Sequence, residues 1–486
     1  METMPLIRRH VEALELDPAL LSGVRIIGPT AVLPSSFRVT TLATAAVAAA
    51  NLGVAAVLRV AGGDAAGAAV APGVAVDSGQ ACAAFLSEAL FLPDGWQVPS
   101  PWDALSGVYR CRDGWIRLHT NYATHRAAAL TALGLPADAG REDVALRVTD
   151  RETDELEAAV VRAGGAAAAL RSRSAWLSSP AGEATAAEPA VQVDRRGEHI
   201  RWAPAPGRRP LDGLRVLDLT RVIAGPVATR FLAAHGAEVL RIDPPGFDEV
   251  PALLPITTQG KRRAFLDLST SDGKERFLNL LREADVLVHG LRPGALDALG
   301  LTEEVFRRTA PSLVIARLDA YGWQGPWAGR RGFDSLVQMS CGIADDGGRA
   351  AAARTSAERA DHVPPAPQPL PAQALDHSTG HHLAAGILAL LASGRSGTVT
   401  ASLIGAANLL YSLGPATPED ASDPAPGSPS PAEGTGAAGV LGAFRRPVTT
   451  FWGPAQAIPV PGIVEGSGAE FTLPAGPLGV DPPAWS

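Results

Sequence analysis

The chain has 486 residues, roughly three times the length of a typical domain, and 46% of them are hydrophobic while 19% are charged. This composition excludes a small disulfide-stapled protein and a fibrous one. The 42 basic and 50 acidic residues give a net charge of −8, and no basic run suggests a duplex-binding face, so we expect no nucleic-acid partner. The cysteines Cys82, Cys111 and Cys341 lie too far apart for a disulfide framework or a metal knuckle, which favours a reducing, cytoplasmic location.

Residues 1–200 contain short helical patterns and one hairpin signal. The N-terminal residues carry charges with no apolar run after them, so we expect no secretory signal. Residues 41–58 are the most apolar stretch, but most are alanine, which favours a buried helix over a membrane span. Residues 107–119 alternate around an Asp-Gly turn and predict two antiparallel strands. Helices are expected at 124–133 and 153–163, each followed by glycine.

A proline-rich stretch, 202–210, indicates a linker, and the pattern after it becomes α/β. Short apolar strand patterns alternate with amphipathic helix patterns as far as residue 318. The predicted strands are 214–219, 237–242, 263–268, 285–289 and 312–318, and the predicted helices between them are 226–235, 271–283 and 302–309. Helices between short apolar strands predict a Rossmann-like, doubly wound parallel sheet.

The remaining chain is less regular. A polar, Ala/Pro-rich stretch at 345–369 interrupts the pattern and precedes an apolar helix at about 377–392. We expect the following division: a small-domain-like α+β region at 1–200, a linker at 201–210, a Rossmann-like domain at 211–412, a disordered linker at 413–439 and a C-terminal docking tail at 440–486. The predicted fold class is therefore α/β, with a Rossmann-like parallel sheet domain and a smaller α+β domain.

Phosphate-binding motifs are missing from this sequence. The sequence has no G-x-x-x-x-G-K-[ST] motif, and the loop after the strand predicted at 214–219 is not G-x-G-x-x-G, so a dinucleotide cofactor is unsupported. The loop there has small residues before a helix N-terminus, where anions are attracted, although most such turns only connect a strand to its helix. His377, His381 and His382 lack the spacing of a zinc protease because Ser378 stands where Glu would be required, so we predict no metal site.

Asp376 lies directly before the apolar helix. An aspartate there is most often an N-cap that accepts a backbone N–H bond. The same donors and the helix dipole keep a carboxylate ionised, which a nucleophile also needs. From the pattern alone, the capping role is favoured.

A series of motifs from residue 211 onward resembles the family III CoA-transferases, which include formyl-CoA and carnitine CoA-transferases and the related α-methylacyl-CoA racemases. The motifs are, in order, LDGLRVLDLTRVIAGPVATRFLAAHGAEVLRIDPPG, QGKRRAFLDLSTSDGKERF, ADVLVHGLRPGALDALGL, PSLVIARLDAYGWQGPWAGRRGFDSLVQMSCGIA and PLPAQALDHSTGHHLAAGILALL. Their succession is more specific than any one of them. The resemblance implies a Rossmann-like fold, acyl-CoA and carboxylic acid substrates, no cofactor beyond coenzyme A as co-substrate, and a homodimer.

The resemblance also assigns roles to residues. It places the family's nucleophilic aspartate at Asp376, which reverses the preference for a simple cap, and a second acidic position beside the active site at Asp334. The loop that lies along CoA falls on Val222, Ala224 and Gly225, and a basic position used for CoA falls on Arg331. Lys261, Arg262 and Arg292 are either contacts to CoA phosphates or surface cations.

Parts of the sequence depart from the family pattern. The segments GVYRCRDGWIRLHTNYATHRAAALTALGLP and AWLSSPAGEATAAEPAV resemble the family's small domain and the segment after it, yet they precede the nucleophile, as though the usual halves were exchanged. Phe333 occupies the position of the racemases' catalytic His, and Ile223 that of a Gln in formyl-CoA transferase. We therefore expect a CoA-transferase that forms an aspartyl-CoA intermediate. An acyl-CoA racemase or epimerase, and a degenerate CoA-ester-binding protein, remain the alternatives.

Overall fold

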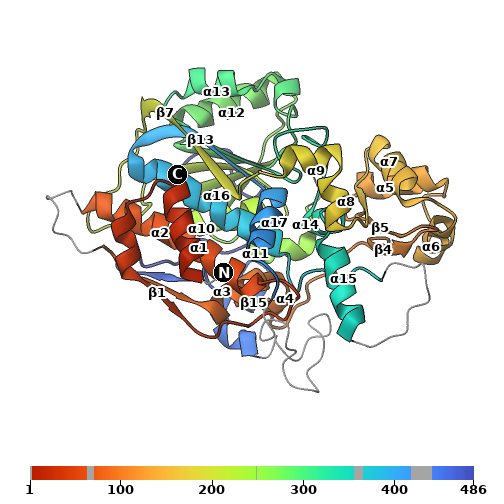
Figure 1. Ribbon diagram of the computed structural model, residues 1–486. Helices are drawn as coiled ribbons and strands as arrows, with labels where there is room; N and C mark the ends of the chain where they lie inside the picture. Colours follow the sequence, from red (N-terminus) through yellow and green to blue (C-terminus); the bar gives the residue numbers. More distant parts are fainter. Residues whose placement is uncertain (1–2, 63–70, 248, 355–364, 417–439) are drawn as a thin grey trace.

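The computed structural model describes residues 3–62, 71–247, 249–354, 365–416 and 440–486 (Figure 1). The strands are β1 (Val24–Ile27), β2 (Val74–Asp77), β3 (Leu92–Pro93), β4 (Gly107–Arg110), β5 (Trp115–Leu118), β6 (Ala167–Ala169), β7 (Val191–His199), β8 (Arg215–Leu219), β9 (Glu238–Asp243), β10 (Lys261–Phe265), β11 (Val286–His289), β12 (Val314–Asp319), β13 (Arg395–Ser402), β14 (Arg446–Thr450), β15 (Gly453–Ala457) and β16 (Ile463–Val464).

The helices occur between and around these strands. They are α1 (Thr3–Ala13), α2 (Val39–Ala61), α3 (Ser78–Phe85), α4 (Ser87–Leu90), α5 (Ala123–Leu133), α6 (Arg141–Thr149), α7 (Thr153–Arg162), α8 (Arg173–Leu177), α9 (Pro180–Thr185), α10 (Ala224–Ala234), α11 (Leu254–Thr257), α12 (Ser271–Glu283), α13 (Glu303–Thr309), α14 (Asp334–Ser340), α15 (Ile343–Arg354), α16 (Ala374–Ser393) and α17 (Leu403–Ser412).

A seven-stranded sheet in the order β10-β9-β8-β11-β12-β13-β7 forms the main body. All of its neighbouring pairs are parallel except β13 with β7. Successive residues of one strand face opposite layers: Val216 and Val286 pack with α10, α16 and α2, whereas Leu217 and Leu287 pack with α12 and α13. This two-faced burial confirms the Rossmann-like, doubly wound α/β fold.

The N-terminal segment lies on one face of this body. α2 packs along α16, and both helices are almost fully buried (Figure 1). By length and composition α2 is apolar enough to cross a membrane, but 89% of its most apolar window is buried inside the protein, as the sequence predicts for 41–58. β1 and β2, which α2 connects, pair in parallel. β16 from the C-terminal segment adds to β2 as an antiparallel third strand.

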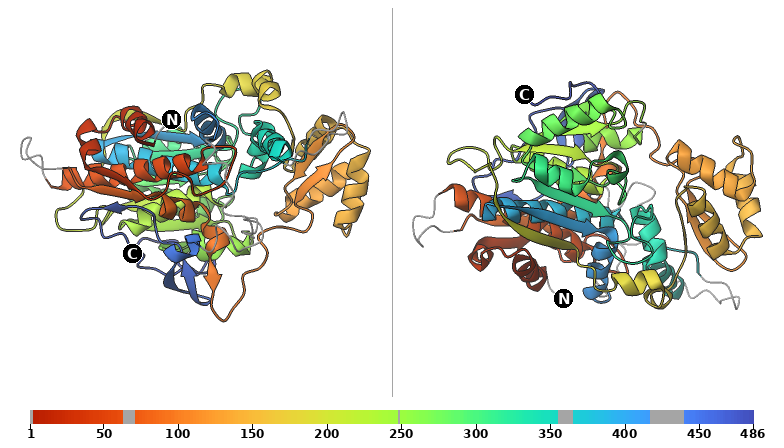
Figure 2. Two further views of the ribbon diagram at one scale, coloured as in Figure 1. Left: turned by 60° about the horizontal axis from the view of Figure 1, so that its bottom comes forward. Right: turned by 90° about the horizontal axis from the view of Figure 1, so that it is seen from above.

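A smaller α+β unit projects from the main body (Figure 2). Its sheet, in the order β4-β5-β6, is antiparallel, and α5, α6 and α7 cover it around a separate core that includes Leu105, Ile116 and Val160. The predicted hairpin at 107–119 is confirmed. This compact unit covers fewer residues than the region expected at 1–200. Residues 1–99 pack on the main body instead, and β7 joins the seven-stranded sheet of the main body.

The C-terminal residues 440–486 run over the main body. β14 and β15 form a hairpin that pairs with β3 from the N-terminal segment. Further on, the Trp485 indole donates a hydrogen bond to the Leu280 carbonyl oxygen at 3.1 Å and packs beside the α12 core. The stretch expected to be a disordered linker, 413–439, falls mostly outside the described residues.

Candidate active site

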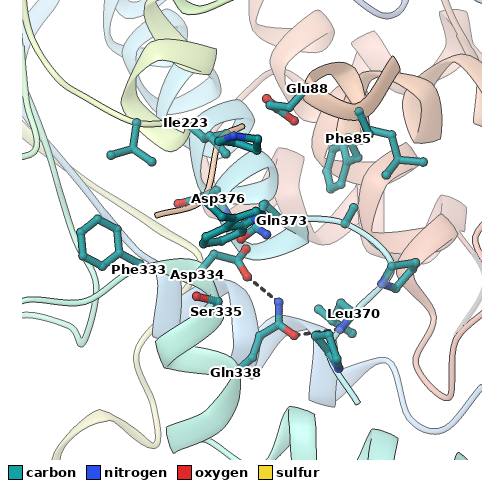
Figure 3. Close-up of a pocket in the computed structure, with 18 of the residues that line it drawn as sticks. Phe85, Glu88, Ile223, Phe333, Asp334, Ser335, Gln338, Leu370, Gln373 and Asp376 are labelled. Carbon is teal, nitrogen blue, oxygen red and sulfur yellow. Dashed lines mark hydrogen bonds between the residues drawn. The ribbon is translucent and has the colours of Figure 1, made fainter. Parts of the chain in front are cut away.

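A cavity of about 820 Å³ lies where the main body, the N-terminal segment and the smaller unit meet. Part of its wall is the loop after β8, so it opens at the carboxyl end of a parallel strand, where ligands of open α/β sheets bind. The residues that line it include Phe85, Glu88, Trp102, Arg117, His119, Tyr122, Val222, Ile223, Phe333, Asp334, Ser335, Gln338, Gln373 and Asp376. Figure 3 shows Asp334 and Asp376 side by side in this cavity.

Asp334 joins two helix starts. It is the first residue of α14, and its Oδ2 accepts the backbone N–H groups of Leu375 (2.8 Å) and Asp376 (3.0 Å) in the first turn of α16. The Gln338 side chain donates to the other carboxylate oxygen. Asp334 is thus the capping acid of α16, supplied from a distant part of the chain.

Asp376 does not have the capping role that the pattern favours. It is the third residue of α16, whose N-cap is Gln373 without a side-chain capping bond. Burial raises the pKa of Asp376 well above its ordinary value, and the negative charges of Asp334 and Glu88 add to this effect. Burial likewise raises the pKa of Asp334, to about 6. Two carboxyl groups with raised pKa values in one cavity are a common feature of catalytic sites.

A third carboxylate comes from the N-terminal segment. Glu88, in α4, accepts a hydrogen bond from His377 Nε2 at 3.1 Å, and Phe85 stacks on the His377 ring with centroids 5.1 Å apart. Burial opposes ionisation of Glu88, but the facing His377 lowers its pKa below the ordinary value. The residue after Asp376 is therefore tied to a segment nearly three hundred positions earlier.

The loop after β8 differs from an ordinary strand-to-helix turn. Val222 has φ of +64°, a left-handed conformation that is costly for a β-branched residue, and its side chain lines the cavity. Ala224 and Gly225 begin α10 and do not line it. Gly225 is small for a packing reason, since a Cβ there would lie 2.3 Å from Thr220 Cβ, and Gly380 of α16 gives room to the Ala224 carbonyl oxygen in the same way.

Glu249 holds this loop in place. One of its carboxylate oxygens accepts the Val222 N–H at 3.3 Å and a bond from Arg241 at 3.0 Å. The other accepts the Tyr122 hydroxyl at 2.9 Å, and Tyr122 belongs to the smaller unit. The buried acid therefore couples the strained loop to the smaller unit across the cavity.

The predicted basic residues separate in the structure. Arg331 lies beyond the cavity lining, where burial lowers its pKa and the nearby positive charge of Arg292 adds to this effect. Lys261 is fully buried and donates to Asp218 at 3.0 Å, so its interpretation as a phosphate contact is wrong. Arg262 donates to the Ala484 carbonyl oxygen at 2.7 Å and faces the C-terminal segment.

The three histidines of α16 are buried and engaged with protein groups. His377 meets Glu88, as above, His381 Nδ1 lies 2.8 Å from the His377 carbonyl oxygen, and His382 Nε2 lies 3.2 Å from His10 Nε2. These contacts explain why the residues cluster in the sequence without invoking a ligand.

Several lining residues were not predicted from sequence. Glu88 precedes every motif, whereas Arg117 and His119 lie in the segment that resembles the family's small domain, where the resemblance assigns them no role. His119 stacks flat on Phe333, with centroids 3.6 Å apart, and burial lowers its pKa to about 3. A pairing of two distant aromatic residues leaves no local signal, so only the structure brings them together.

The main body of this chain is similar to a known protein family. Residues 211–438 match the model of CoA-transferase family III. The acetyl-coenzyme A transferase nodX of Hypoxylon pulicicidum is 31% identical over 270 residues, which are 51% of this chain and 45% of that protein. The probable fatty acyl-CoA transferase Rv3272 of Mycobacterium tuberculosis is 36% identical over 200 residues, 38% of this chain and 46% of that protein.

A third relative and two solved structures extend this list. A formyl-CoA:oxalate CoA-transferase of Escherichia coli is 32% identical over 211 residues, 40% of this chain and 47% of that protein. A crystal structure of Rv3272 has a TM-score of 0.35 at 33% identity, covering 42% of this chain and 58% of that one. A CAIB/BAIF family protein from Brucella suis has a TM-score of 0.36 at 22% identity, covering 51% and 65%.

The chain spans about half the length of the curated relatives it matches. The match begins at the first strand of the parallel sheet and includes both carboxylates of the cavity. Residues 211–438 of this chain are similar to CoA-transferase family III.

Proposed function

We propose that this protein transfers CoA from an acyl-CoA thioester to a free carboxylic acid, with Asp376 as the nucleophile and Asp334 beside it. The observation that carries the proposal is the shared cavity: both carboxylates line it, and Asp334 binds the backbone N–H of Asp376 itself. The relatives named as acetyl-CoA, fatty acyl-CoA and formyl-CoA transferases support the reaction class.

The reaction proceeds through two thioester exchanges. Ionised Asp376 attacks the thioester carbonyl, the C–S bond breaks, and an acyl-aspartyl anhydride and a CoA thiolate form. The thiolate attacks the aspartyl carbonyl, releases the donor acid as its carboxylate and leaves an aspartyl-CoA thioester. The acceptor carboxylate then repeats both steps in reverse, so that the new acyl-CoA leaves and Asp376 is restored.

Each chemical step needs a donor for a tetrahedral oxyanion. The N–H groups of Leu375 and Asp376 already bond to Asp334, so they do not serve. The Ser335 hydroxyl lines the cavity and makes no hydrogen bond within the described residues, which suits it to this role. The first N–H groups of α10, beside Val222 and Ile223, have no acceptor within their own helix and offer a second source.

Trapping the covalent intermediate tests the proposal. During turnover with an acyl-CoA, hydroxylamine should convert Asp376 to a hydroxamate and borohydride should reduce it to an alcohol, and peptide mass spectrometry locates either change. Modification must require the acyl-CoA. Turnover without any modification of Asp376, or modification at another carboxylate, would contradict the assignment.

Substituting Glu88 by glutamine tests the electrostatics of the site. The charge of Glu88 raises the pKa of Asp376, and activity is lost as the pH falls through that pKa because only the ionised carboxylate attacks. Neutralising Glu88 lowers the pKa of Asp376, so the acid limb of kcat/KM should move to lower pH. Glu304→Gln, an exposed change on α13, serves as the control and should leave the limb in place. An acid limb of kcat/KM that does not move in Glu88→Gln would contradict the proposed effect of Glu88 on the pKa of Asp376.

The racemase alternative requires two acid/base partners at an α-carbon. Phe333 stands where the racemases have their catalytic His, so one of the two partners is missing at that position. Homodimer formation and a cytoplasmic location stay predictions. Light scattering measures the first.

A further inference from the structure

Arg117 is a cation in the cavity that forms no ion pair within the described part of the chain. It lies on β5 of the smaller unit, and its guanidinium makes no hydrogen bond or ion pair with any residue in the described ranges. Its Nε is buried with no hydrogen-bond partner among the described residues, and the centroid of the Trp102 ring lies 5.1 Å from the guanidinium carbon. Burial lowers its pKa, because the charge is removed from water and the nearby negative charge of Asp334 offsets this effect only in part.

Other arginines of the smaller unit form ion pairs with nearby carboxylates. Arg126 pairs with Asp103 at 3.1 Å, Arg171 with Glu157 at 2.6 Å, and Arg112 with Glu152 at 2.7 Å. Asp334 attracts Arg117 electrostatically, but its own oxygens are occupied by Gln338 and the α16 backbone. A guanidinium is the side chain best suited to grip a planar carboxylate through two parallel hydrogen bonds.

We propose that Arg117 binds a second carboxylate on the transferred or accepting acid, so that the preferred substrates are dicarboxylic acids and their mono-CoA esters. This inference rests on the proposed function. The reacting carboxylate of the substrate lies at Asp376 on the main body. The distal carboxylate meets Arg117 on the smaller unit, beside the Trp102 ring. Because Arg117 shares the cavity with the nucleophile and lies within the electrostatic reach of Asp334, it serves the acyl end of the substrate.

The test compares acids of equal length with one or two carboxylates. CoA exchange with succinate and glutarate is measured against butyrate and valerate for the native chain, Arg117→Ala and Arg117→Lys. In Arg117→Ala the KM for the dicarboxylates should rise roughly ten- to a hundredfold while the monocarboxylates change less than about twofold, and Arg117→Lys should recover part of the loss. An equal loss for both series, or no preference for dicarboxylates in the native chain, would overturn the proposal.

A matched control lies on the same hairpin. The Arg110 guanidinium also lies over a tryptophan ring, that of Trp115, at 5.4 Å, and it donates to the Gly114 carbonyl oxygen. Because Arg110 lies outside the cavity, Arg110→Ala should keep the native selectivity.

Calorimetry with succinate tests binding at Arg117 separately from the CoA-transfer reaction. Binding that is lost in Arg117→Ala and kept in Arg110→Ala supports Arg117 even without exchange, whereas absence of CoA exchange with every acid contradicts only the proposed function. Undiminished succinate binding in Arg117→Ala contradicts the inference.

Discussion

Replacing Asp376 by asparagine should reduce CoA exchange by at least about a thousandfold, because the variant has no carboxylate to form the anhydride. The side chain keeps its size and its place in the first turn of α16, so acyl-CoA binding, measured by calorimetry, should persist. A steady-state assay of labelled CoA exchange measures the loss.

The same change should stabilise the fold at neutral pH. Burial and the neighbouring carboxylates raise the pKa of Asp376 in the folded state, so the native chain loses stability as the pH rises from the unfolded pKa through the folded one. Asparagine does not titrate, and its advantage in free energy of unfolding should therefore be small near pH 4 and larger at pH 7. Urea unfolding at both pH values measures the difference.

Asp319 provides the matched control. It is a buried carboxyl at the end of β12 whose pKa burial raises to about 7, but it lies outside the cavity. Asp319→Asn should gain stability at neutral pH in the same direction and retain CoA exchange. Exchange preserved in Asp376→Asn, or lost equally in Asp319→Asn, would remove Asp376 from the proposed role.

The strands and helices of the sheet could be predicted because each carries its own signal. Adjacent residues such as Val216 and Leu217 face two different cores, so the central strands β8, β11 and β12 each carry a run of apolar residues. The resemblance to a family then located Asp334 and Asp376. In both cases the information is local in the sequence or held in a short motif.

Some local patterns were misleading because distant chain supplies what they lack. Asp376 suggests an N-cap, yet Asp334, 42 positions earlier, accepts the N–H groups at this helix start. The polar stretch from residue 345 was expected to be irregular, but α15 runs from 343 to 354. Its Gly347 and Gly348 allow close packing, since a Cβ on either would lie 2.3 Å from a carbonyl oxygen of Gln368 or Ala366.

Other site residues had no signal at all. Glu88 and Arg117 are single charged residues in segments whose motifs are weak, and their importance comes only from what they face. Lys261 gave the opposite error. From the sequence it was either a contact to a CoA phosphate or a surface cation, whereas in the structure it neutralises a buried aspartate at the base of the Val222 loop.

That buried pair supports the second large prediction: Asp218→Ala should lower the free energy of unfolding by about 3–5 kcal/mol. Asp218 accepts bonds from Lys261 at 3.0 Å, from the Thr229 hydroxyl at 2.7 Å and from the Thr220 N–H at 2.9 Å. Removing it leaves the Lys261 charge buried beside Arg241 without an acid. Urea unfolding near pH 7 measures the loss.

A double variant and a pH series test the cause of this loss. Burial already lowers the pKa of Lys261 to about 8 in the native chain. The free energy of unfolding therefore rises with pH between about 8 and the pKa of lysine in the unfolded chain. Without Asp218 that rise should begin at lower pH. Asp218→Ala with Lys261→Met removes both charges and should recover much of the stability, because an apolar pair replaces an unpaired ion. If the single variant lost less than about 1 kcal/mol, or the double variant recovered nothing, the ion pair would not be what holds the loop base together.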